Sequence, residues 1–153
     1  MEKSFKLVVQ YATDSPDIPT RSQFRRWVKA ALIQDAEIVL RIVDEPEGCE
    51  LNNHFRKKNY ATNVLTFVYD DTQLLTGDIV LCAAIIRKEA RQQHKNLMAH
   101  YAHLTVHGIL HLQGYDHIED AEAVIMEQME TQILARLGYD DPYKEHGDAT
   151  SSQ

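Results

Sequence analysis

Segment 107–117 constrains this chain most, because it carries three histidines at spacings that suit one metal ion. His107 and His111 are four residues apart, so in a helix they lie on one face, one turn apart. Gly114 stands where helices commonly end in a left-handed residue, which allows His117 to turn back toward the same ion. Three protein ligands leave a fourth position for water, as in catalytic zinc sites. The spacing therefore predicts a helix that ends in a metal site.

Two nearby residues extend this prediction. His103 lies eight residues before His111, which is about 12 Å along a helix axis, so the two imidazoles cannot share one ion. We expect His103 to be buried and hydrogen-bonded, or to contact a metal ligand from behind. Asp116 either orients a ligand imidazole or is an ordinary turn residue. Three imidazoles suit one zinc ion per chain, although nickel and iron also accept such ligands.

The spacing H-x-x-x-H-x-x-G-x-x-H also resembles the ligand skeleton of the metzincin proteases. Those enzymes carry a glutamate general base directly after the first histidine, where this chain has Gly108. A metal-bound water can have a pKa near ~7, so hydrolysis does not require that carboxylate. The glycine counts against a peptidase, and a metzincin-like hydrolase of peptides or esters stays an alternative.

The same segment, 107–117, resembles H-G-x-L-H-L-x-G-Y-D-H, the signature of the YbeY family of bacterial endoribonucleases. Thr62–Phe67 resembles the T-N-V-L-S-F strand of that family, Gly77–Val80 resembles its G-D-I strand, and Gly138-Tyr139 resembles part of its L-G-Y motif. The resemblance covers roughly residues 5–143. Three positions depart from the family pattern without touching the histidines. Two prolines and a serine of the family are replaced here by Ala61, Val68 and Thr66.

This resemblance implies a zinc-dependent endoribonuclease that is specific for single strands and hydrolyses phosphodiester bonds. It further implies a role in processing the 3′ end of small-subunit ribosomal RNA and in ribosome quality control. The implied partners are ribosomal RNA and the small ribosomal subunit. A non-catalytic ribosome assembly factor with a structural metal is the remaining alternative.

The resemblance also assigns residue roles. The characteristic arginine of the family maps onto Arg56, which we expect in a loop just before a strand. Its guanidinium can hold phosphate oxygens and stabilise charge that develops during cleavage. We therefore predict that Arg56 and His107 are catalytic, and that Arg56, Asn63 and Thr66 bind substrate. The predicted metal ligands are His107, His111 and His117, with Asp116 and His103 behind them.

Apolar periodicity predicts an α+β fold, in which a mixed, roughly four-stranded sheet packs with about five helices and the metal site lies at the end of a central helix. Apolar residues on both faces make the strand near residues 38–43 central. The polar bend at 70–73 favours antiparallel pairing of the strands on either side. A capping box at Thr20 begins the first helix, and the helix that carries the paired histidines is expected from about Leu97 to Leu112. Asp120 is the expected N-cap of the last helix, which is predicted to run through Ile125, Met129, Ile133 and Leu137 and to stop at Gly138.

A chain of 153 residues can form one domain, which we expect over residues 1–143, followed by a disordered polar tail at 144–153. No apolar run reaches the ~18 residues of a membrane span and the N-terminus lacks the apolar core of a signal peptide. We therefore expect a cytoplasmic protein without membrane contact. Cys49 and Cys82 are expected to be buried thiols rather than a disulfide.

The net charge of −7 disfavours nucleic acid at first sight. Ten of the 23 acidic residues lie from Asp116 onward, so the preceding part of the chain is nearly neutral. Within that part, Arg87, Arg91 and Lys95 are spaced by four residues on one predicted helix. Such stripes are usually solvated faces, and this one is a candidate track for an RNA backbone.

Overall fold

The computed structural model describes residues 4–56, 62–69, 74–115 and 119–143, with the backbone alone for Phe55 and Arg56. The tail predicted at 144–153 lies outside these residues. The described residues form four strands and five helices, which confirms the predicted α+β class. In chain order these are β1 (Phe5–Ala12), α1 (Arg21–Ala31), β2 (Ala36–Val43), α2 (Glu45–Arg56), β3 (Val64–Tyr69), β4 (Leu75–Cys82), α3 (Ala83–Gln92), α4 (Leu97–Leu112) and α5 (Asp120–Arg136).

The four strands form one mixed sheet in the order β1-β2-β4-β3. β2 pairs in parallel with both β1 and β4, which confirms its predicted central position. β3 pairs with β4 in the antiparallel direction, as the polar bend between them indicated. The sheet therefore ends in an antiparallel edge strand, and this strand lies next to α4.

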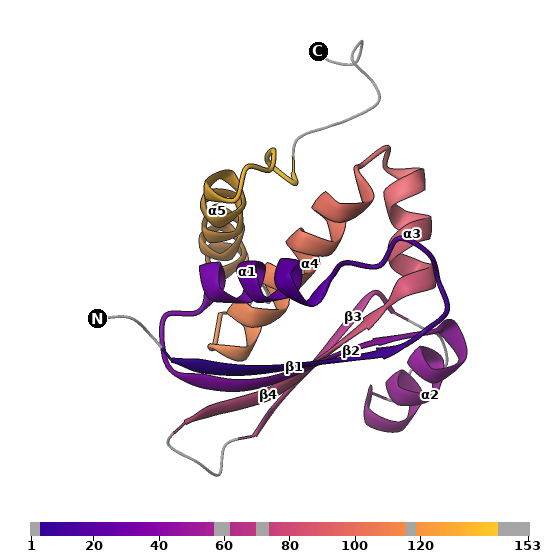
Figure 1. Ribbon diagram of the computed structural model, residues 1–153. Coiled ribbons are helices and arrows are strands. Elements are labelled where there is room, and N and C mark those ends of the chain that lie inside the picture. Colours follow the sequence, from indigo (N-terminus) through magenta and orange to yellow (C-terminus); the bar gives the residue numbers. More distant parts are fainter. Residues whose placement is uncertain (1–3, 57–61, 70–73, 116–118, 144–153) are drawn as a thin grey trace.

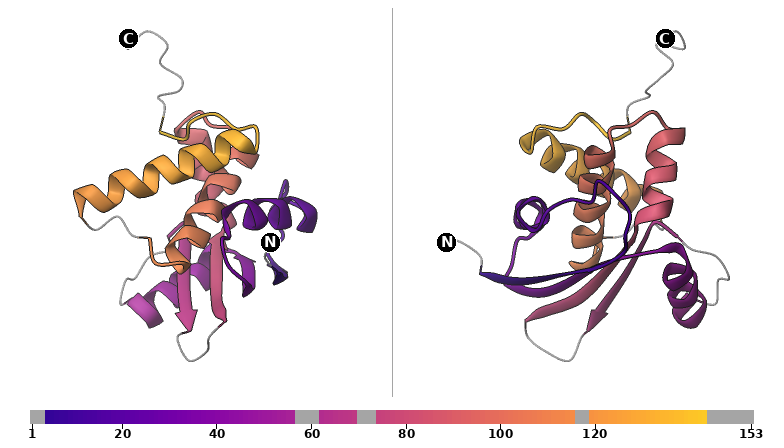
Figure 2. Two further views of the ribbon diagram at one scale, coloured as in Figure 1. Left: turned by 90° about the vertical axis from the view of Figure 1, so that its left-hand side faces the viewer. Right: turned by 45° about the vertical axis from the view of Figure 1, so that its right-hand side comes forward.

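Helices cover the two faces of the sheet unequally. α1 and α4 lie over one face, and α5 packs on the side of α4 that is turned away from the sheet (Figure 1, Figure 2). Side chains of β4 alternate between two clusters, with Ile79 and Leu81 in the main core and Val80 and Cys82 in a smaller one that includes Leu51 of α2. The main core thus lies between the sheet and α4.

α4 is the central helix of this arrangement. It contacts three other helices, α1, α3 and α5, and both strands β3 and β4. Ten of its residues are buried, on more than one face, which is the pattern of a helix surrounded by protein. Its bounds agree with the predicted helix at 97–112. Any side chain near its end is therefore placed by contacts from both the sheet and α5.

Aromatic residues anchor α1 to α4. Trp27 is 1% exposed and its ring packs edge-on against Phe24, with ring centroids 5.5 Å apart. Phe24 packs in the same way against Tyr101 of α4, at 6.4 Å. Edge-to-face pairs stabilise a core beyond their buried area by about 0.5–1.5 kcal/mol. Trp27 and Phe24 are thus core residues and not platforms for stacking bases.

Two of the predicted helix ends are confirmed by the structure, and one is wrong. The predicted capping box is present: the Thr20 side chain accepts from the backbone of Gln23, and the Gln23 side chain accepts from the backbone of Thr20. Gly114 has φ +101°, which confirms the left-handed turn after α4. The predicted N-cap of α5 is wrong, because Glu119 occupies that position and Asp120 is the first helical residue. Both carboxylates still lie at the positive end of the helix dipole, which accounts for an acidic start.

The apolar residues expected along α5 differ in burial. Ile125 is 52% exposed, whereas Met126 is 1% exposed. The buried residues of α5 are Met126, Glu130, Ile133 and Leu134. Met129 and Leu137 are partly buried against the same core. Within the described residues, no helix has the length and apolar character that a membrane span requires.

Candidate metal centre

Two of the predicted metal ligands stand together on α4. The rings of His107 and His111 are stacked, with their centroids 6.4 Å apart and their planes inclined by 27°. Both side chains are half-buried. The stacked arrangement shows that the four-residue spacing directs both imidazoles to one side of the helix, where a single ion could contact both.

The Nδ1 atom of His107 is held by Glu130 of α5, whose Oε2 lies 2.6 Å away. An ionised carboxylate only accepts hydrogen bonds, so the imidazole proton belongs on Nδ1. The lone pair then belongs to Nε2, which is the atom that would bind a metal. Histidine ligands commonly donate their other ring N–H to a carboxylate in this way. The surroundings of His107 therefore fit the role of a metal ligand.

His111 is held from the opposite side, by the sheet. The Oγ1 atom of Thr66 on β3 lies 3.1 Å from Nδ1 of His111. A hydroxyl oxygen can accept the Nδ1 proton, which again assigns the lone pair to Nε2. Thr66 was predicted to bind substrate. The structure places its hydroxyl against a ligand histidine, and its contact with substrate stays a prediction.

The carboxylate of Glu130 accepts hydrogen bonds from several side chains. Its side chain is fully buried, and besides His107 it accepts from Nε2 of His103, at 2.8 Å, and from the hydroxyl of Tyr143. Burial by itself raises the pKa of a carboxyl group, but hydrogen bonds from His103 and His107 outweigh it and lower the pKa of Glu130 to about 2. The same burial lowers the pKa of His103. We infer that Glu130 is an ionised carboxylate that accepts hydrogen bonds from the side chains around it.

His103 lies beside this centre. It is largely buried, and it is hydrogen-bonded to Glu130, which also holds His107. Its predicted role behind the metal ligands stays a prediction. Its ring and that of His107 meet edge to face, with centroids 6.4 Å apart. Because its Nε2 is engaged by Glu130, His103 supports the site and does not add a ligand.

The packing around Gly108 gives a reason why this position does not carry the metzincin glutamate. A Cβ atom at this position would lie 3.1 Å from Cδ1 of Ile79, which is fully buried on β4. Position 108 therefore faces the core between α4 and the sheet, and a glutamate there would bury a carboxylate among apolar atoms. Packing at this position therefore disfavours a glutamate base, which weakens the alternative of a peptide hydrolase.

Asn63 belongs to a second polar network near the start of β3. Its Nδ2 donates to both oxygens of Glu89 on α3, at 3.0 and 3.3 Å. Oε1 of Glu89 also lies 2.9 Å from Nε2 of His100. Burial raises the pKa of Glu89, and hydrogen bonds from His100 and Asn63 lower it, with a net decrease. The side-chain amide of Asn63 is thus engaged in joining β3 to α3 and α4, and its predicted contact with substrate stays untested.

Three predicted residues are not placed by the structure. Asp116 and His117 lie outside the described residues, and only the backbone of Arg56 is described. Arg56 is the last residue of α2, so its predicted location in a loop is wrong. The described residues by themselves contain no group of three side chains that could hold a metal. The third ligand, His117, therefore stays a prediction from the sequence.

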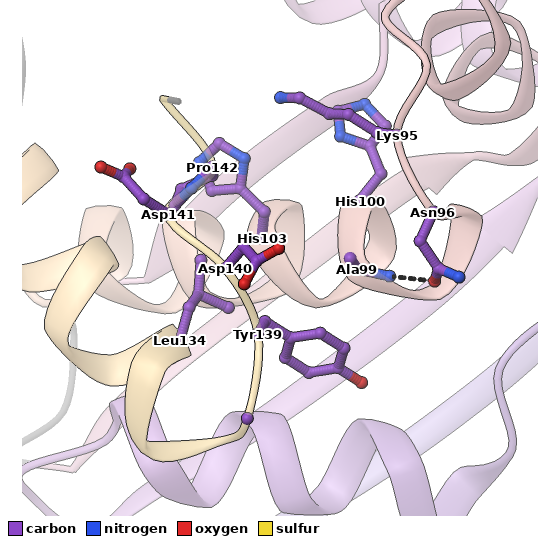
Figure 3. Close-up of a pocket in the computed structure, with 11 residues that line it drawn as sticks. Lys95, Asn96, Ala99, His100, His103, Leu134, Tyr139, Asp140, Asp141 and Pro142 are labelled. Atoms are coloured by element: carbon purple, nitrogen blue, oxygen red, sulfur yellow. Dashed lines mark hydrogen bonds between the residues drawn. The ribbon is translucent and has the colours of Figure 1, made fainter. Parts of the chain in front are cut away.

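A cavity of 430 Å³ lies beside this centre, where the first half of α4 meets the end of α5. His100 and His103 line it from α4, and Tyr139 lines it from the segment after α5 (Figure 3). Lys95 stands on one rim and residues 140–141 supply two aspartates on another (Figure 3). With charges of both signs, the cavity does not select a ligand of one charge.

Sequence reasoning missed Glu130. The available signal was a glutamate four residues after Met126 and four before Leu134, at the spacing of one helical face. A charged residue at such a position is almost never fully buried unless it is paired. To recognise Glu130 as buried, one must know which face of α5 packs on the core, and the sequence pattern did not provide this.

Comparison with known proteins adds independent information. The profile of one family, Endoribonuclease YbeY, matches residues 10–138. A Nitrosomonas europaea protein named Endoribonuclease YbeY is 65% identical over 142 residues, which cover 93% of this chain and 87% of that protein. A Nitrosospira multiformis protein of the same name is 61% identical over 153 residues, with 90% and 81% covered.

A solved structure is also similar. The solution structure of TM1509 from Thermotoga maritima is 25% identical to this chain and has a TM-score of 0.58. The match covers 90% of this chain and 99% of that one. The α+β arrangement is therefore shared between the two proteins over nearly their whole lengths.

Proposed function

Because this chain belongs to the YbeY family of endoribonucleases, we propose that it is a metal-dependent enzyme that hydrolyses phosphodiester bonds in single-stranded RNA. The observation that carries the metal dependence is the pair His107 and His111, whose Nδ1 atoms are held by Glu130 and Thr66. That arrangement directs two Nε2 lone pairs to one side of α4. Two such ligands on one helix turn are a typical beginning of a zinc site.

We assign the metal ligands as His107, His111 and His117, with one zinc ion per chain as the preferred occupant. Nickel and iron accept the same donors. A bound ion would polarise a phosphate oxygen and activate a water molecule. The protein side chains hold the two helix histidines in fixed orientations, and Asp116 is assigned to orienting the third.

Arg56 is assigned to the phosphate. A guanidinium presents a planar fork of donors that matches two phosphate oxygens and stabilises the charge that grows during cleavage. The position of Arg56 at the end of α2, seven residues before Asn63, supports a role for the segment that leads into β3. Asn63 and Thr66 complete the proposed contacts with substrate.

We further propose ribosomal RNA as substrate, at the 3′ end of the small-subunit RNA, with the small ribosomal subunit as partner. The support is the family itself. The basic stripe on α3 contributes less than its spacing indicated, because Arg87 donates to the backbone carbonyl of Pro16, at 2.6 Å, and pairs with Asp17. Arg91 is left as its candidate contact with an RNA backbone. α3 ends at Gln92, so the prediction that Lys95 lies on the same helix is wrong.

A cleavage assay on a single-stranded RNA oligonucleotide tests the function. We expect cleavage by the zinc-loaded protein, loss of cleavage on chelation, and recovery when zinc is returned. A duplex of the same sequence should resist. A wild-type protein that binds zinc and leaves the single strand intact would favour an assembly factor with a structural metal.

Two variants test the assigned residues. Arg56→Ala should keep the fold and the zinc content, and should lose at least tenfold in cleavage rate, because it removes charge stabilisation only. Lys58→Ala, which removes a neighbouring cation, is the matched control and should cleave normally. His111→Ala should lose zinc and cleavage together. Cleavage by Arg56→Ala at the wild-type rate would refute its role.

A further inference from the structure

The buried carboxylate of Glu130 is the least expected group in this fold. Its side chain has no exposure and lies on a helix face otherwise formed by Met126, Ile133 and Leu134. Burying a charge is costly, and apolar residues of similar volume often stabilise such positions equally well or better. Packing alone therefore does not account for a glutamate here. Its hydrogen-bond partners provide the explanation.

The geometry excludes one tempting role for this residue. Glu130 is not a general base in place of the glutamate missing at position 108. Its Oε2 is engaged by His107, and its Oε1 is engaged by His103 and Tyr143. A base must reach the water or hydroxyl that it deprotonates, and a fully buried carboxylate with three donors has no such access. Glu130 acts through the residues that it contacts.

We propose that Glu130 is a positioning residue, which fixes the orientation and the proton location of His107 so that Nε2 is presented to the metal. This inference rests on the proposed function, since it concerns the same metal centre. His111 depends on the neutral hydroxyl of Thr66, at 3.1 Å, whereas His107 has a charged partner at 2.6 Å. The carboxylate bond is the stronger of the two, and it raises the basicity of the ligand.

His103 and Tyr143 have a defined part in this proposal. They hold the other oxygen of Glu130, so the carboxylate cannot rotate away from His107. Tyr143 follows α5 in the chain, and its ring packs on His103 with centroids 5.3 Å apart. The segment after α5 thereby contributes one side chain, Tyr143, to the network behind His107. Metal affinity should depend on this segment as well as on the ligands.

Glutamine at position 130 distinguishes positioning from packing. It keeps the shape of the side chain but replaces one acceptor oxygen by an NH2 donor. That donor must face an N–H of either His103 or His107, so one imidazole has to move its proton to the other nitrogen. For His103 this nitrogen is Nδ1, which is buried and has no hydrogen-bond partner among the described residues. Neither choice restores the original network.

The first test is zinc affinity, measured by competition with a chromophoric chelator. Glu130→Gln should bind zinc about 10–100-fold more weakly than the wild type, which is the usual effect of losing a partner that orients a ligand. The control is Glu127→Gln, on the exposed side of the same helix, which should bind as the wild type does. Wild-type affinity in Glu130→Gln, within twofold, would overturn the proposal.

Two further results separate the possible failures. If His111→Ala binds zinc as tightly as the wild type, the metal site of the proposed function is wrong, whatever Glu130 does. If Glu130→Gln does not fold, imidazole 15N shifts of the unsubstituted, metal-free protein still decide. They should report the proton of His107 on Nδ1 and the lone pair on Nε2. A proton on Nε2 would contradict the positioning role directly.

Discussion

Replacing Gly108 by alanine tests whether packing against the core is the reason that this position carries no side chain. The added Cβ would lie 3.1 Å from Cδ1 of Ile79 and 3.4 Å from its Cγ2. Ile79 is fully buried, so its side chain has little room to move. Overpacking of this kind costs about 1–3 kcal/mol. Against it stands the preference of a helix for alanine over glycine, which contributes about 0.5–1 kcal/mol. We expect a net loss of stability of about 1 kcal/mol.

A double-mutant cycle isolates the contact. Ile79→Val removes the Cδ1 atom that the new Cβ would meet, and by itself should cost about 0.5–1.5 kcal/mol. In combination with Gly108→Ala, the vacated space accepts the added methyl group. The double variant should therefore be more stable than the sum of the single effects by about 1 kcal/mol, which is a usual coupling for touching residues.

Urea unfolding of the four metal-free proteins, followed by circular dichroism, measures this coupling. A difference of 1 kcal/mol also shifts the melting temperature of a chain of this size by about 2–4 °C. Additive effects, within about 0.3 kcal/mol, would show that position 108 does not contact Ile79. The explanation of the missing glutamate would then fail.

The same contact predicts the result of restoring the metzincin residue. Gly108→Glu would direct a larger, charged side chain against the buried Ile79, and an unpaired buried charge costs several kcal/mol. Domains are stable by only about 5–15 kcal/mol, so we expect a protein that is largely unfolded or poorly expressed. A well-folded Gly108→Glu variant with peptidase activity would contradict this and would favour the metzincin-like hydrolase.

Three other predictions can be tested by standard means. Gly77→Ala should destabilise the protein by about 1–3 kcal/mol in denaturant unfolding, because its Cβ would lie 2.9 Å from the backbone oxygen of Phe67, which cannot easily shift. Thr20→Ala should cost about 1 kcal/mol in the same assay, since it removes the hydroxyl of a complete capping box, whereas Thr20→Ser should cost much less. Burial raises the pKa of the Cys82 thiol, so the Cys49→Ser variant should react with iodoacetamide at neutral pH only after unfolding; rapid labelling of the folded protein would contradict its burial.

Features that depend on neighbouring residues were predicted well from the sequence. The bounds of α4, the capping box of α1 and the left-handed Gly114 all follow from side chains a few positions apart. The pairing of β3 with β4 follows from the short bend between them. The position of His107 above His111 belongs to the same class, because helix geometry alone sets it.

Arg56 and α5 show where such reasoning stops. Arg56 was expected in a loop just before a strand, yet α2 continues through Arg56. Local propensity is a weak predictor of where a helix ends, and tertiary contacts often extend it. In α5, the apolar residues at 125, 129, 133 and 137 indicated a helix but did not reveal that Glu130 is buried on it. A buried charge depends on partners that lie far away in the sequence.

The sequence was sufficient to place two imidazoles on one turn of one helix, since a repeat of 3.6 residues is a property of the backbone. It was not sufficient to find what holds them. Glu130 is 23 residues from His107 and Thr66 is 45 residues from His111. Those pairs exist only because α5 and β3 pack on α4 from two sides, at rotations set by the whole core. Spacing along the chain determines which side chains share a face, and packing between elements determines which atoms meet.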